Sequence, residues 1–326
     1  NDAELWHLYA VFCTFGKEDG VAAERRAVEL DPQFADAWQI LGSELAARGN
    51  VNEALAAIDR CLAISPLTAD CRGEKARLYA RLGQCSRMEE DLRKGLSSNP
   101  RAANIWHEDR AAALLALGRS DDTILEAFRQ KWALYDADRR KKTEAYDRAL
   151  LAIARGRLAE ADVLLADGEK AIELDPNVQV HARYTWLRVK IALEMSRPKD
   201  AAKMAASFRE RKDVWLGAGR SVLEIPMLRV MSQGDLVSPA ELAKARDAWF
   251  ARTLETDKSM PPIFFWMPAY ADYVETPAEA AVAMRALPVY EESQIGKDVT
   301  IFASIGHILL LSGKPHEAIA PLAKAT

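Results

Sequence analysis

The chain has 326 residues, of which 49% are hydrophobic and 28% are charged. This balance is too apolar for an intrinsically disordered protein and is typical of a well-packed, folded chain. The formal net charge of −4 argues against a protein that binds nucleic acid by neutralising phosphates over its whole surface. No apolar stretch approaches the roughly 20 residues that a membrane-spanning helix needs, so no membrane span is predicted.

The N-terminal third carries a regular proline spacing. Pro32, Pro66 and Pro100 follow one another at a constant interval. Small residues recur in the same register at Ala27, Cys61 and Gly95. In a pair of antiparallel helices, small residues let the backbones approach, and a proline ends the second helix because it lacks an N–H. The spacing therefore predicts successive helix-turn-helix units of about 34 residues.

A wider set of positions shows the type of repeat. The second unit holds Trp38, Leu41, Gly42, Leu45, Gly49, Ala54, Ile58, Cys61 and Pro66. The same order recurs near the end of the chain as Phe302, Ile305, Gly306, Leu309, Gly313, Ala318, Leu322 and Ala325. These positions match the signature of the tetratricopeptide repeat (TPR) family, which the chain resembles. The resemblance implies an all-α fold: a right-handed superhelical array (α-solenoid) of antiparallel helix-turn-helix repeats.

Glycines between paired helices, and the alanines after them, place about nine units along the chain. The units are expected to start near Asn1, Ala35, Ala69, Ala103, Lys142, Ala182, Arg220, Pro261 and Val299. The interval from Trp38 to Phe302 is longer than seven perfect periods, so surplus residues must lie in the middle units. We therefore expect regular to moderately regular repeats in 1–212, degenerate and extended helix pairs in 213–297, and a last, truncated repeat in 298–326. The truncated end predicts that the chain is a fragment of a longer protein.

Helix starts and stops are marked locally. Ser238 and Thr276 each precede Pro-Ala-Glu, which predicts a capping box with proline at the first helical position. Pro198 and Pro315 are expected to open helices similarly. A turn is expected near 135–140, although neither proline nor glycine marks it. Pro226 should kink its helix or delay the start of that helix.

The four cysteines, Cys13, Cys61, Cys71 and Cys85, form no Cys-x-x-Cys pair, so spacing predicts no metal site. Cys61 stands at a small-residue position of a repeat. A buried free thiol is favoured there over a disulfide, which predicts a reducing compartment and a cytoplasmic location. A signal or anchor outside the chain is the alternative.

No catalytic motif is present, and the five histidines are scattered along the sequence. We therefore predict no enzymatic activity, no metal and no cofactor; an active site in the irregular span 213–297 is the alternative. The basic run 139–142 is interpreted as a solvated helix junction, with an acidic partner or a lipid headgroup as the alternative. The aromatic residues between 264 and 273 are interpreted mainly as core, with one or more of them contacting a neighbour or a ligand.

The family resemblance also implies a binding surface, because first helices of TPR arrays line a concave groove that holds peptides or helices of partner proteins. Carried over by register, the groove residues are Gln39, Ser43, Arg77, Arg81, His107, Tyr146, Trp186 and Lys190. Lysines and asparagines that clamp a terminal carboxylate in some family members are missing here. An acidic or amphipathic segment near Arg77 and Arg81 is one candidate ligand.

The sequence thus predicts a non-catalytic protein-interaction scaffold with a protein or peptide partner. The alternative is a regulatory or sensing region of a larger signalling protein, because the segment with Cys61, Cys71 and Cys85 is similar to TPR tails of bacterial serine/threonine kinases. Arginine outnumbers lysine 28 to 16, which favours a GC-rich bacterial gene. The oligomeric state is not predicted.

Overall fold

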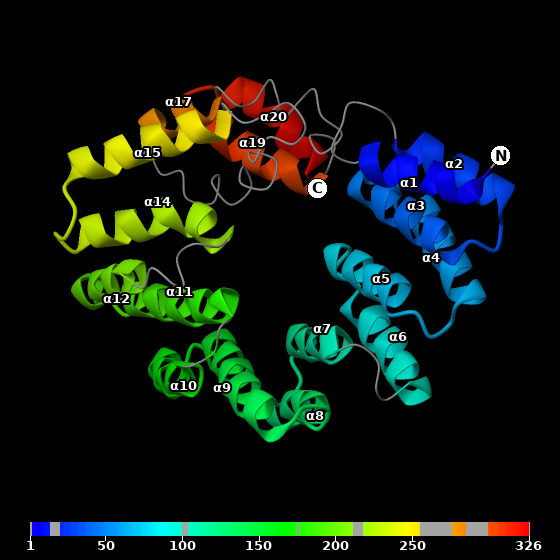
Figure 1. The fold of residues 1–326 in the computed structure, drawn as a ribbon, viewed down its shortest axis with the longest axis horizontal. Coiled ribbons are helices and arrows are strands. Elements are labelled where there is room, and N and C mark those ends of the chain that lie inside the picture. Colours follow the sequence, from blue (N-terminus) through cyan, green and yellow to red (C-terminus); the bar gives the residue numbers. More distant parts are fainter. Residues whose placement is uncertain are drawn as a thin grey trace. The chain divides into compact units, whose positions relative to one another are not determined.

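The computed structural model describes residues 2–13, 20–99, 104–173, 175, 177–210, 218–254, 276–284 and 299–325. Within these residues every regular element is an α-helix (Figure 1). The helices are α1 (Ala3–Cys13), α2 (Gly20–Leu30), α3 (Ala35–Ala47), α4 (Val51–Ile64), α5 (Ala69–Arg81), α6 (Cys85–Ser98), α7 (Asn104–Ala116), α8 (Asp121–Trp132), α9 (Ala137–Ala154), α10 (Leu158–Ala171), α11 (Val178–Glu194), α12 (Pro198–Glu210), α14 (Ala218–Gln233), α15 (Pro239–Leu254), α17 (Pro277–Met284), α19 (Val299–Leu311) and α20 (Pro315–Lys324).

Within each unit, many helices that follow one another along the chain pack together. The first helix of a pair contacts the second, as α3 contacts α4, and the second helix contacts the first helix of the next pair, as α4 contacts α5. The helices form two compact units, 1–120 with 253–326 and 121–252, each of which we describe by itself. The division by repeat regularity, at 212 and 297, stays a prediction.

Part of the surplus of the middle repeats lies in longer helices. The first helices α3, α5 and α7 each have 13 residues, whereas α9 has 18 and α11 has 17. Longer helices or loops in the middle units were predicted, and longer helices are found at α9 and α11. The turn between α8 and α9 occupies 133–136, slightly before the expected 135–140, because the Asp136 side chain accepts the Arg139 N–H at 2.8 Å and so caps α9.

Most local signals near the prolines are also confirmed. The Ser238 hydroxyl accepts the Glu241 N–H at 3.2 Å, and a Glu241 carboxylate oxygen accepts the Ser238 N–H at 2.9 Å, which completes the capping box. Pro198, Pro277 and Pro315 open their helices. Pro226, by contrast, lies inside α14, which begins at Ala218, so the start of this helix is not delayed.

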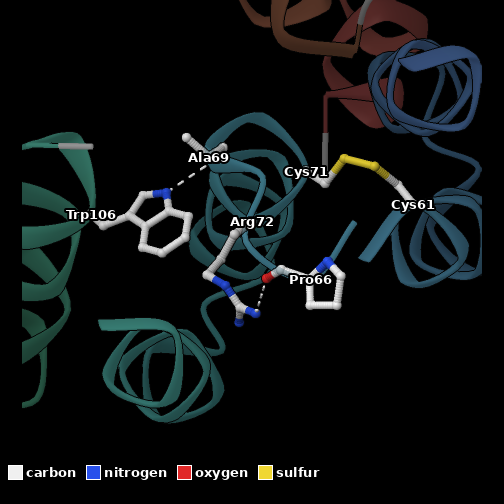
Figure 2. Close-up of a disulfide and its surroundings, with 6 residues drawn as sticks. All are labelled: Cys61, Pro66, Ala69, Cys71, Arg72 and Trp106. Atoms are coloured by element: carbon white, nitrogen blue, oxygen red, sulfur yellow. Dashed lines mark hydrogen bonds between the residues drawn. A yellow bond between two sulfur atoms is a disulfide. The ribbon is translucent and has the colours of Figure 1, made fainter. Parts of the chain in front are cut away.

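A disulfide joins α4 to α5 (Figure 2). Cys61 and Cys71 are both buried, and their Cα atoms lie 6.2 Å apart, within the range that a disulfide spans. The expectation of a free thiol at Cys61 was therefore wrong. The small-residue position at the end of α4 faces the first turn of α5, which brings the two sulfur atoms together.

Many turns between paired helices share one backbone arrangement. A residue just after the first helix has a positive φ at Gly49, Gly83, Gly118, Gly156, Ser196, Asp235 and Gly313. At Ser196 the N–H donates to the Leu193 carbonyl at 2.9 Å, and the next N–H, of Arg197, donates to the Ala192 carbonyl at 2.8 Å. These paired bonds satisfy carbonyls that the helix end leaves free. Serine and aspartate are sterically strained in this conformation, whereas glycine is not.

The first prediction tests this strain. We expect Ser196→Gly to raise the free energy of unfolding by up to about 1 kcal/mol, because a residue with a Cβ is strained at positive φ. Urea denaturation measures the change. Ser196→Ala serves as the control and should give no gain, since it keeps the Cβ. A loss of stability in Ser196→Gly would contradict the prediction.

A buried acid–histidine pair connects α1 to α2. Glu24 is fully buried, and its Oε1 lies 2.9 Å from His7 Nδ1. Burial, with a smaller effect of the nearby Glu44 carboxylate, raises the pKa of Glu24 to about 8. Burial also lowers the pKa of His7. Glu24 therefore holds a proton in the folded protein at a pH where it is ionised in the unfolded chain.

The second prediction concerns pH. Glu24 binds its proton more tightly in the folded state than in the unfolded state. The stabilisation that this proton gives is therefore complete below pH 4.5 and is lost as pH rises towards 8. Between pH 6.5 and 8, where His7 is neutral when folded, we expect a loss of about 2 kcal/mol relative to Glu24→Gln. Urea denaturation of both proteins across this range measures it. Parallel pH profiles for the two proteins would refute the assignment.

Candidate functional site

In the first unit, four of the predicted groove residues lie on the first helices α3 and α5. Gln39 and Ser43 on α3 are half-buried, and Arg77 and Arg81 on α5 are exposed. Arg77 Nη2 donates to Glu74 Oε1 at 2.5 Å, and this hydrogen bond raises the pKa of Arg77. The charge of Arg77 is thus largely compensated within its own helix.

An acidic group from α7 adds to this compensation. Burial raises the pKa of Asp109 to about 6, against the opposing effect of the Arg77 charge. Asp109 therefore changes its charge near neutral pH beside Arg77. An anionic ligand at Arg77 would have to compete with Glu74 and, above about pH 6, with Asp109.

Contacts to three other helices hold the first turns of α5 in place, and Figure 2 shows those made by Cys61 and Trp106. The disulfide fixes Cys71 to α4, and Arg72 Nη1 donates to Asp91 Oδ2 of α6 at 2.9 Å. From α7, Trp106 Nε1 donates to the Ala69 carbonyl at 3.1 Å, and the Arg72 guanidinium lies 5.4 Å from the Trp106 ring centre. The position of α5 is therefore set by packing on several sides.

His107 differs from the other predicted groove residues. It lies on α7 and is only 2% exposed. Its register position matches the family pattern, but α7 turns this side chain into the core next to the buried Trp106. We therefore leave His107 out of the candidate binding surface.

In the second unit, three predicted residues take part in two contacts between a cation and an aromatic ring. Tyr146 on α9 and Trp186 and Lys190 on α11 lie on first helices, and Arg183, which sequence reasoning missed, joins them. The Arg183 guanidinium lies 5.5 Å from the Tyr146 ring centre, and Lys190 Nζ lies 5.6 Å from the Trp186 ring centre. We call these four residues the cation–aromatic row. The spacing of 183, 186 and 190 along one helix face was the signal available in the sequence.

The row rests on a well-packed base. Tyr146 packs at a tilt on Tyr184, with ring centres 5.2 Å apart, and the buried Tyr184 hydroxyl donates to the Lys142 carbonyl. Tyr184 also fills the space over Gly168 of α10, where an added Cβ would overlap the ring. Glycine is thus required at position 168 for α10 and α11 to pack this closely.

A buried ion pair sits directly after Tyr146. Lys131 Nζ of α8 lies 2.6 Å from Asp147 Oδ2 of α9, and both side chains are almost fully buried. Trp132 Nε1 donates to the same carboxylate oxygen at 2.7 Å. This paired and hydrogen-bonded charge fixes how α8 packs on α9, because breaking it would leave a buried charge without compensation.

The basic run 139–142 is partly neutralised by nearby acids. Lys142 Nζ lies 2.8 Å from Asp138 and 3.0 Å from Asp175, and Arg140 lies 3.7 Å from Glu144. Asp147 instead pairs with the buried Lys131. The run is therefore mainly part of the ion-pair network at the start of α9.

Other predicted features carry no site in the described part of the chain. The described residues contain no group of three histidine, cysteine, aspartate or glutamate side chains placed to hold a metal ion. No described helix has both the length and the apolar character needed to cross a membrane. The aromatic residues between 264 and 273 lie outside the described residues.

The sequence matches no protein-family model and no curated protein at a significant level. Among solved structures, a tetratricopeptide repeat protein from Parabacteroides merdae has a TM-score of 0.51 at 14% identity, over 78% of this chain and 94% of its own. The APC/C hetero-tetramer Cut9–Hcn1 has a TM-score of 0.38 at 14% identity, over 99% of this chain and 52% of the matched one. The human IFIT1 dimer with PPP-AAAA has a TM-score of 0.40 at 14% identity, over 99% of this chain and 62% of the matched one.

Of these three likenesses, that to the P. merdae protein is the one with a TM-score above 0.5, and at such low identity it bears on the fold alone. It agrees with the helix pairs, the left-handed turns and the recurring small residues described above. The chain is an all-α helical repeat array with a TPR-like fold.

Proposed function

We propose that this protein is a non-catalytic scaffold that binds a peptide or helical segment of a partner protein on its first helices. The observation that supports this most is the cation–aromatic row, in which exposed cations and partly exposed rings of α9 and α11 lie together. Arginine, tyrosine and tryptophan are the residue types enriched at binding hot spots. Second helices such as α4 and α10, by contrast, each contact two neighbouring first helices.

The first unit offers a second, weaker surface on α3 and α5. Gln39, Ser43 and Arg81 present polar groups there, while Arg77 is compensated by Glu74. A mixed polar surface suits specificity more than affinity. A regulatory region of a larger signalling protein would use these same faces and remains the alternative prediction.

The third prediction tests where partners bind. Peptides selected from a random display library against the intact chain should lose affinity, by about tenfold or more, in variants that block a first helix. Leu150→Arg places a larger, charged side chain on the first-helix surface of the second unit, on α9. Arg77→Glu with Arg81→Glu reverses two charges on the first-helix surface of the first unit, on α5. The matched second-helix controls are Val163→Arg on α10 and Arg87→Glu with Arg93→Glu on α6, all of which are exposed.

The affinities are measured by fluorescence anisotropy for each selected peptide. Each peptide should respond to at least one first-helix variant and to neither control. Failure to select any peptide, or peptides that respond to the second-helix controls alone, would overturn the proposal.

We also propose an oxidising compartment in place of the cytoplasmic one that a free Cys61 predicted. Disulfides persist in secreted and periplasmic proteins and are rare where thiols are kept reduced. Cys61 and Cys71 are buried and directly bonded, so the crosslink is part of the packing between α4 and α5. Cys85 is a free, half-buried thiol on α6.

The fourth prediction follows from this crosslink. Cys61 and Cys71 are 10 residues apart, and closing a loop of that size stabilises the folded state by about 2–3 kcal/mol in the chain-entropy model. We expect a reductant to lower the free energy of unfolding of the wild type by this amount. Cys61→Ala with Cys71→Ala, the control, should not respond. Equal stability with and without reductant would contradict the proposal.

A further inference from the structure

Among the residues that the structure describes, the cations of the cation–aromatic row have no acidic partner, which sets them apart from another cation on the same helix. Arg183 and Lys190 are exposed, and no described carboxylate lies within ion-pair distance of either. On another side of α11, Arg188 lies 3.0 Å from Asp162 and 2.5 Å from Glu169. The chain thus neutralises the cation that packs against α10 and leaves the two on the row uncompensated.

The uncompensated charges also have a fixed orientation. Each cation lies over an aromatic ring, Arg183 over Tyr146 and Lys190 over Trp186. Such contacts attract the cation electrostatically and reduce the freedom of its side chain. Tyr146 is itself held by Tyr184, whose hydroxyl is bonded to the α9 backbone. A ligand carboxylate would therefore meet cations that are already positioned, which lowers the entropy lost on binding.

The spacing of the row defines the ligand. Arg183 and Lys190 are two helical turns apart, or about 10 Å along the axis of α11. An extended peptide in the polyproline II conformation advances about 3.1 Å per residue with three residues per turn, so two carboxylates three residues apart lie on one face at about this distance. Leu150, one turn after Tyr146 on α9, is 39% exposed and offers an apolar contact beside the row.

The charge pattern favours a short acidic peptide over nucleic acid. Glu194 lies one turn beyond Lys190 on the same side of α11, and it would repel a chain that carries a phosphate at every nucleotide. A peptide with carboxylates at two defined places avoids this repulsion. The two compensated cations nearby, Arg148 and Lys142, add no free charge, because they pair with Glu144 and with Asp138 and Asp175.

We propose that the cation–aromatic row binds an extended acidic segment of a partner protein, with carboxylates about 10 Å apart on Arg183 and Lys190 and an apolar side chain near Leu150. This inference rests on the proposed function, since it names the chemistry of a ligand for the first-helix faces. The proposed acidic ligand thus binds α9 and α11 rather than α5, where Arg77 and Arg81 were the candidate residues.

The test uses synthetic peptides on the intact chain. The probe is a fluorescein-labelled peptide of four Glu-Leu-Ser repeats, and the matched probe replaces each glutamate by glutamine. We expect the glutamate peptide to bind about tenfold more tightly than the glutamine peptide, and less tightly at high salt. Arg183→Gln with Lys190→Gln should remove that difference. Lys199→Gln with Lys203→Gln on α12, which makes the same change of charge at exposed positions, should leave binding within about twofold of wild type.

A charge swap guards against loss of binding through misfolding. Arg183→Glu with Lys190→Glu should bind a peptide of four Lys-Leu-Ser repeats and reject the glutamate peptide. Equal binding of the glutamate and glutamine peptides, or unchanged binding by the Arg183→Gln, Lys190→Gln protein, would overturn the inference. Preferential binding of a twelve-nucleotide oligouridylate, lost in that same variant, would assign the row to nucleic acid and also overturn it.

The outcomes separate the two proposals. If display-selected peptides still lose affinity in the first-helix variants while the acidic probe fails, the chemical class of the ligand is wrong and the scaffold proposal stands. If selected peptides respond only to the second-helix controls, the scaffold proposal fails as well.

Discussion

Close approach between helix backbones is the constraint on which this array depends. Gly42 of α3 packs on Ile58 of α4, and Gly306 of α19 packs on Leu322 of α20, at distances that leave no room for a Cβ. Alanines with no exposed surface, such as Ala54, Ala161 and Ala201, extend the same packing along the second helices. Because each pair buries its apolar sides on its partner and on the next pair, a first helix keeps one side for other molecules. Where that side carries aromatic and cationic residues, it is the surface proposed here for binding a partner.

The sequence predicted the fold well because its strongest signals are local. Helix pairs were predicted from glycine, alanine and proline positions, and the capping box at Ser238 needed a single short motif. The positive φ angles at Ser196 and Asp235 were not predicted, since neither position is occupied by glycine. The Cys61–Cys71 disulfide was missed for another reason: spacing along the chain does not show that the end of one helix meets the start of the next. Contacts between repeats, rather than within them, were the harder part.

The candidate site shows the same limit. Register selected Tyr146, Trp186 and Lys190, and the structure places Lys190 over the Trp186 ring and Tyr146 against Tyr184, while their role as groove residues stays a prediction. It also selected His107, which the structure buries, because a family position does not tell how far a particular helix is rotated into the core. Arg183 was missed because its importance depends on the ring of Tyr146, which belongs to another helix. Register identifies candidate positions, whereas burial and charge compensation decide which of them face a ligand.

Charge compensation is the more informative of these two criteria here. Several cations of the second unit have a carboxylate partner close by, as Arg188, Arg197 and Lys142 do. These ion pairs are half-buried, and near a protein surface such pairs stabilise a fold only slightly, so their main effect is to hold side chains in place and to cancel charge. Arg183 and Lys190 are held in place by aromatic rings instead, which leaves their charge available. A fold that needed only stability would gain as much from ion pairs at these positions, and the uncancelled charge therefore points to an acidic ligand rather than to packing.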